Sequence, residues 1–167
     1  MTRHAIPLKE FDAEMKSTRR LVERVPSDKA QWKPHEKSFA LGHLTQLVCW
    51  MPGWIAQTLN KPIMDIQGGG EGGGYSFQPT EKLVAMFDDN VEQARDALSR
   101  VTDDALDEMW SLNIGPQVVM SMPRGEAVRQ HMNHFCHHRG QLTVYCRLID
   151  VPLPMIYGPT ADEKWGG

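Results

Sequence analysis

Four long segments of the sequence repeat apolar residues at spacings of three and four, which is the period of a helix with one face against a core. The second segment is apolar around most of its circumference, so we expect it to be the central helix. No stretch alternates regularly enough to predict a long strand. The pattern therefore predicts an all-α fold, a four-helix bundle, built from segments 8–25, 38–59, 80–101 and 123–149.

Two connections between these segments are expected to be irregular. The stretch 60–79 contains a glycine-rich loop, 68–74, which lacks the Gly-Lys-Ser/Thr ending of a phosphate-binding loop. The segment 110–122 contains the turn-forming pair Gly115-Pro116 and predicts a small hairpin or an irregular crossover before the last helix. No internal repeat is visible, and we expect a single domain spanning residues 1–167.

The charge balance argues against two classes of partner. A formal net charge of -3 and a pI near 6.1 give no electrostatic reason to bind nucleic acid or an anionic membrane. The longest apolar stretch, 39–59, is interrupted by polar residues and a proline, and the amino terminus lacks a basic segment followed by an apolar run. We therefore expect a soluble, unexported, cytoplasmic protein that acts on or binds a small molecule.

A histidine cluster is the strongest chemical signal. Four of the seven histidines lie in the last helical segment, at His131, His134, His137 and His138. On a helix, the first, second and fourth of these fall within an arc of roughly 60° beside the apolar face. A spacing of three or four lets two imidazoles share a metal ion, which leaves open His134 with His138, or His134 with His131 or His137. A hydrogen-bonded core network or an exposed helix face would explain the same cluster without a metal.

A metal site would need a further ligand from another helix. His43 lies on the apolar part of the second segment, where an unpaired imidazole is costly to bury; a hydrogen bond to a backbone carbonyl is the alternative. The three cysteines lie in apolar helical stretches and are expected to be reduced thiols. Helical phase turns Cys136 about 200° away from His134 and so argues against a thiolate ligand. No glutamate follows the first histidine of any pair, which argues against zinc-peptidase chemistry.

Several strings of residues resemble the DinB/YfiT-like family. They are His134-Phe-Cys-His-His-Arg-Gly-Gln-Leu142, Tyr157-Gly-Pro-Thr-Ala-Asp-Glu163 and Trp32-Lys-Pro-His-Glu-Lys-Ser38. Together with the order of the helices, the resemblance covers nearly the whole chain. It implies a four-helix bundle of up-down-down-up topology, often a homodimer, with a divalent metal held by three histidines on two helices.

The metal pair of that motif corresponds to His134 and His138. The third family position corresponds to Leu47, whereas this chain has His43 one turn earlier. We therefore expect His43, His134 and His138 to hold zinc or nickel, and a degenerate site without metal is the alternative.

Three further residues are candidates for the pocket around these ligands: Tyr145, Gln141 and His131. A core aromatic residue is the favoured explanation of Tyr145, and a hydrogen-bond donor to the pocket is the alternative. Arg139 points away from His134 by helical phase, which favours a structural salt bridge or an interface role over a place in the pocket.

The resemblance also implies an activity. Family members of known activity resemble thiol-dependent transferases or isomerases, in which the metal lowers the pKa of a thiol. Our leading hypothesis is therefore a divalent-metal-dependent enzyme acting on small electrophiles, by thiol transfer with a low-molecular-weight thiol cosubstrate or by hydrolysis. The alternative is a non-catalytic, stress-related bundle that dimerises or binds a small ligand.

Overall fold

The computed structural model describes residues 6–67 and 74–166 of the chain. Its long helices are α1 (Leu8–Val22), α2 (Leu41–Asn60), α3 (Thr80–Arg100) and α5 (Arg124–Leu148). The shorter elements are η1 (Ser27–Lys29), α4 (Asp103–Asp107), β1 (Ile63–Asp65), β2 (Met109–Ile114) and β3 (Gln117–Pro123). Except for Gly74, the glycine-rich loop expected at 68–74 lies outside the described residues.

The all-α class expected from the sequence is wrong. In the described part of the chain, five α-helices accompany a mixed three-stranded sheet of order β1-β2-β3, so the fold is not a clean four-helix bundle. Strand β1 pairs in parallel with β2, and β2 pairs antiparallel with β3. The hairpin alternative is the one adopted at 110–122, where Gly115 has a φ of +55°, a conformation that favours glycine in tight hairpin turns. The three-residue strand β1 was missed because so short a segment shows almost no alternation.

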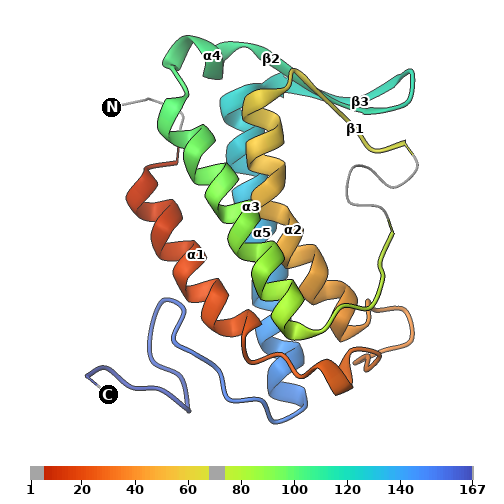
Figure 1. The fold of residues 1–167 in the computed structure, drawn as a ribbon, viewed down its shortest axis with the longest axis vertical. Coiled ribbons are helices and arrows are strands. Elements are labelled where there is room, and N and C mark those ends of the chain that lie inside the picture. The colour runs from red at the N-terminus through yellow and green to blue at the C-terminus, as the bar shows by residue number, and fades with distance from the viewer. Residues whose placement is uncertain (1–5, 68–73, 167) are drawn as a thin grey trace.

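The four long helices lie side by side (Figure 1). Helices α1 and α5 run in one direction, whereas α2 and α3 run in the opposite one, and the sheet extends from the end where α2 stops and α5 begins. Helix α2 packs against both α3 and α5 and is buried over most of its length, which confirms its central position. No helix among the described residues is long and apolar enough to cross a membrane.

Arg139 is a buried cation on the core-facing side of α5. Its side chain is 3% exposed, and its Nη1 donates to Glu14 Oε2 at 2.5 Å and to Thr18 Oγ1 at 3.2 Å. Its Nη2 donates to the hydroxyl of Tyr157 at 2.6 Å. The structural salt bridge expected from the helical phase of Arg139 is confirmed, and it joins α5 to α1 and to the C-terminal segment.

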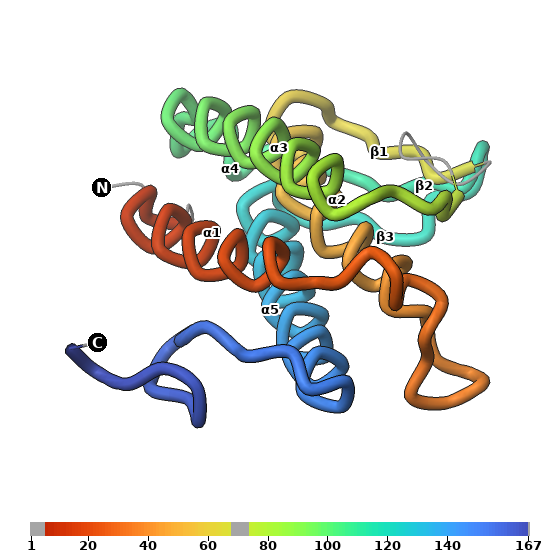
Figure 2. The backbone as a smooth tube through the Cα atoms, turned by 60° about the horizontal axis from the view of Figure 1, so that its bottom comes forward, coloured from red at the N-terminus to blue at the C-terminus, as the bar shows by residue number. Residues whose placement is uncertain are grey.

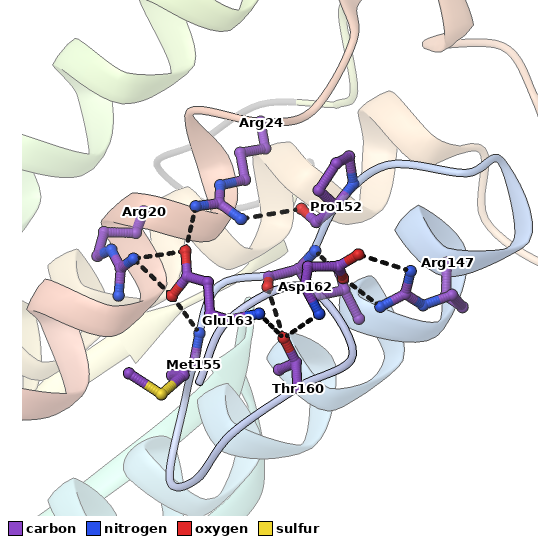
Figure 3. A network of polar contacts seen from close by, with 9 residues as sticks. Arg20, Arg24, Arg147, Pro152, Met155, Thr160, Asp162 and Glu163 are labelled. Atoms are coloured by element: carbon purple, nitrogen blue, oxygen red, sulfur yellow. Dashed lines mark hydrogen bonds and ion pairs between the residues drawn. The ribbon is translucent and has the colours of Figure 1, made fainter. Parts of the chain in front are cut away.

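The C-terminal segment runs back beside the end of α1 (Figure 2). Glu163 accepts hydrogen bonds from the backbone N–H of Met155 at 2.9 Å, from Arg24 at 2.5 Å and from Arg20 at 2.7 Å (Figure 3). Together these donors lower the pKa of Glu163 to about 2, and the Met155 N–H has the largest effect. Residues 157–163, which carried much of the family resemblance, therefore fasten the C-terminal segment to the end of α1.

We predict that Glu14→Ala lowers the free energy of unfolding by about 3 kcal/mol, because it leaves the Arg139 guanidinium buried without its carboxylate. Urea denaturation followed by circular dichroism measures the change. The control is Glu10→Ala, which removes an exposed carboxylate from the same helix and should cost less than about 0.5 kcal/mol. Equal losses in the two variants would contradict the role given to the buried pair.

Candidate ligand-binding cavity and histidine cluster

A cavity of about 780 Å³ lies between α2, α5 and the sheet. This volume falls within the range of roughly 300–1,000 Å³ that is usual for small-molecule sites. The residues that line it are Leu47, Trp50, Trp54, Gln57, Met64, Ile66, Trp110, Leu112, Met120, Gln130, His131, Asn133, His134 and His137. The cavity is therefore mainly apolar and aromatic, with amides and imidazoles along the α5 side.

Regular side-chain periodicity builds two of the walls. On β2, Trp110 and Leu112 are two residues apart and so face the same side of the sheet. Leu112 pairs directly with Met120 of β3, which brings both side chains to the cavity. On α2, the lining residues from Leu47 to Gln57 follow the helical spacing of three and four.

His131 is the most buried of the clustered histidines. Its Nε2 lies 3.0 Å from Thr58 Oγ1, and its ring meets Trp110 edge-on at a centroid distance of 5.6 Å and Trp54 at 6.1 Å. Burial, together with the nearby imidazole of His134, lowers the pKa of His131 to about 4. His131 is therefore uncharged near neutral pH and helps to hold two aromatic walls of the cavity in place.

His134 and His138 approach each other closely on α5. Their Nε2 atoms are 2.9 Å apart, and His138 Nδ1 lies 2.8 Å from Gln141 Oε1. The amide nitrogen of Gln141 lies 3.0 Å from His137 Nε2. Burial is the first cause that lowers the pKa of both His134 and His138, and neighbouring histidines lower the two pKa values further.

The Gln141 amide determines where the protons of this pair lie. Because its Oε1 is only an acceptor, His138 donates from Nδ1 and is left with a lone pair on Nε2. His134 then donates from Nε2, so its Nδ1 carries no proton. An outer hydrogen bond of this kind is also how proteins orient histidines that ligate metals.

His43 and Tyr145 lie elsewhere. The His43 ring stacks on Tyr75 at a centroid distance of 5.0 Å and contacts Phe39 at 4.3 Å, and within the described residues no contact joins it to His134 or His138. Tyr145 donates to the backbone carbonyl of Phe39 at 3.3 Å and does not line the cavity.

The donor set fits a metal ion only in part. Two imidazoles bound to one tetrahedral zinc ion would have nitrogens about 3.3 Å apart, close to the His134–His138 separation of 2.9 Å. In residues 6–67 and 74–166, however, no three His, Cys, Asp or Glu side chains come together to hold an ion. Burial raises the pKa of Cys49, and that of Cys146 to about 11, so both are protonated thiols and poor ligands. The expected site of His43, His134 and His138 stays a prediction.

Comparisons with known proteins place the chain in a family. The sequence profile of the DinB family matches residues 1–165, and the chain belongs to this family, which confirms the resemblance drawn from the sequence. An uncharacterized protein of Bacillus subtilis (strain 168), YrdA, is 27% identical over 167 residues, which is 95% of this chain and 89% of YrdA. The homodimer, the metal and the thiol cosubstrate that the resemblance implied stay predictions.

Two solved structures support the fold. The DinB-like protein YjoA of Bacillus subtilis has a TM-score of 0.67 and 18% identity, over 89% of this chain and 95% of that one. A DinB-like protein of Bacillus cereus ATCC 10987 has a TM-score of 0.70 and 22% identity, over 90% and 95% of the two chains. The likeness extends over most of each chain, so the small sheet accompanies a DinB-like helical arrangement.

Sequence reasoning missed the cavity although it had identified its parts. Trp50 and Trp54 belong to the second helical segment, which is apolar around most of its circumference, and Trp110 begins the segment 110–122. The signal that pointed to a shared wall was the two-residue spacing of Trp110 and Leu112, with the turn and Met120 after it. The spacing predicts that these side chains share one face of a strand, but it does not predict which helices that face will contact.

We predict that His131 makes the protein less stable as the pH falls. Its pKa is near 6.5 in the unfolded chain and about 4 in the folded one, so the unfolded state binds a proton first and stability is lost as the pH drops below 6.5. Between about pH 7.5 and pH 5.0 this loss is about 2 kcal/mol. Urea denaturation at both pH values measures it, with His131→Gln as the control that keeps a polar side chain without the titration. The same pH dependence in wild type and variant would contradict the assignment.

Proposed function

We propose that this protein binds a small organic molecule in the cavity between α2, α5 and the sheet, with His134 beside the bound molecule. The cavity itself carries the proposal: its volume is about 780 Å³, three tryptophans line it, and a row of imidazoles and amides lies along one side. Pockets of this size that combine apolar walls with a few polar groups are typical ligand sites.

The aromatic walls of the cavity offer a bound molecule a large contact area, and their rings are held in fixed orientations. Trp54 lies close to two histidines, with ring centroids 6.1 Å from His131 and 5.9 Å from His134, so its ring is held within a group of aromatic neighbours. Trp110 is 1% exposed and packs against His131 from the sheet side. Aromatic rings fixed in this way supply large contact surfaces with little loss of conformational entropy on binding.

His134 supplies the reactive group. It lines the cavity, and burial holds its pKa below the usual value, so the imidazole is uncharged near neutral pH and can accept a proton. His138 and Gln141 orient it through consecutive hydrogen bonds of 2.9 and 2.8 Å. The pair therefore suits a proton-accepting role toward a bound molecule.

Filling the cavity tests this proposal. We predict that the double variant Leu47→Trp/Leu112→Trp, which adds bulk on the α2 wall and on the sheet wall, weakens binding of the uncharged dye N-phenyl-1-naphthylamine by at least about tenfold. The increase in dye fluorescence on binding gives the affinity. The control Val144→Trp/Leu148→Trp places the same bulk on exposed positions of α5 and should leave binding unchanged. Failure of the wild type to bind the dye, or equal effects of the two variants, would contradict the proposal.

A second candidate function is a divalent-metal-dependent enzyme acting on small electrophiles by thiol transfer or hydrolysis. The observation that favours it is the His134–His138 pair, whose nitrogens lie near the spacing of two metal ligands. A bound zinc or nickel ion would supply a Lewis acid at the edge of the cavity. His134 and His138 would hold it, and Gln141 would orient His138.

Metal analysis of untagged protein, after loading with zinc or nickel and dialysis, tests this candidate. About one equivalent of metal is expected, lost in His134→Ala and in His138→Ala. His35→Ala is the matched control, because this exposed loop histidine lies outside the cluster. His43→Ala decides whether His43 is a third ligand. No bound metal after loading with either ion would eliminate the metal-dependent reading.

A further inference from the structure

The described walls of the cavity carry no carboxylate, ammonium or guanidinium group. None of the described residues that line it is an aspartate, glutamate, lysine or arginine, and its polar groups are side-chain amides and imidazoles. A bound anion would therefore lose its hydration without gaining a cationic partner.

The arginine at the start of α5 is paired with groups outside the cavity. Arg124, at the first position of α5, is buried, and its Nη1 donates to Glu108 Oε2 at 2.8 Å and to the backbone carbonyl of Ala105 at 3.1 Å. Arg129 precedes the lining residue Gln130 but does not itself line the cavity. The described walls thus lack the arginine or lysine with which proteins usually bind carboxylates and phosphates.

The polar groups that are present suit a neutral polar end on the ligand. Gln130 and Asn133 of α5 and Gln57 of α2 each carry one acceptor and two donor positions. Such groups bind a hydroxyl, carbonyl or amide without requiring charge. The tryptophans occupy the rest of the wall and favour flat, apolar parts of a molecule.

We infer that the cavity selects an uncharged, flat, mainly apolar molecule with a neutral hydroxyl, carbonyl or amide group, and rejects carboxylates and phosphates. This inference rests on the proposed ligand-binding function and gives the chemical class of the ligand.

Two probes of the same shape test the inference: 2-naphthamide, which is neutral, and 2-naphthoate, which is an anion near neutral pH. Calorimetric titration of the full-length protein should give an affinity for the amide at least about tenfold higher than for the carboxylate. Equal or tighter binding of the carboxylate would overturn the inference while leaving the proposed function in place. Binding of neither probe, with no binding of the uncharged dye, would overturn the proposed function itself.

Variants that introduce a positive charge into the cavity wall provide a second test. Leu112→Lys places a cation on the sheet wall and should raise the affinity for 2-naphthoate relative to 2-naphthamide by about tenfold. Met120→Lys, at the directly paired position of β3, should act in the same way and serves if the first variant does not fold. Leu148→Lys, at an exposed position outside the cavity, is the control and should not change the ratio. An unchanged ratio in the folded wall variants would overturn the inference.

Discussion

The buried ion pair between Arg139 and Glu14 sets the rotation of α5 about its own axis. Arg139 shares the core-facing side of α5 with Phe135 and Leu142, and its guanidinium is paired only when that side meets α1. Turning the helix would leave a buried charge without its partner, which costs several kcal/mol. With this rotation fixed, the side of α5 that carries His131 and His134 faces α2 and the sheet, where the cavity lies.

The small sheet completes the site. Trp110 is buried against His131, which holds β2 close to α5. Asp65 links β1 to the hairpin turn, because its Oδ1 accepts from the backbone N–H groups of Gly115 at 3.0 Å and Gln67 at 2.8 Å. These backbone donors also lower the pKa of Asp65. A four-helix bundle without the sheet would leave this side of α2 and α5 uncovered, whereas here the sheet forms a further wall of the cavity.

Local periodicity was sufficient to predict the long helices, the clustering of histidines on one side of α5 and the salt-bridge role of Arg139. It was insufficient where tertiary contacts decide the outcome. Strand β1 is ordered by pairing with β2, which is distant in the sequence. His43 shares a helix face with residues near the cavity, yet its ring stacks on Tyr75, a contact that no helical wheel can predict. The His134–His138 pair was predictable as neighbours, but the role of Gln141 required the observed hydrogen bonds.

The chemistry of the site follows from these placements. Partial burial lowers the pKa values of His131, His134 and His138, and the cavity is apolar because tryptophans from two helix turns and one strand meet there. In this DinB-family protein, an apolar cavity therefore lies next to an oriented pair of imidazoles.

The most direct measurement is a crystal structure of the untagged protein grown with 2-naphthol. We predict that the naphthol ring lies between Trp54 and Trp110, with its hydroxyl within hydrogen-bonding distance of a histidine or amide of α5. Naphthol bound only elsewhere on the protein, with the cavity filled by its own side chains, would contradict it.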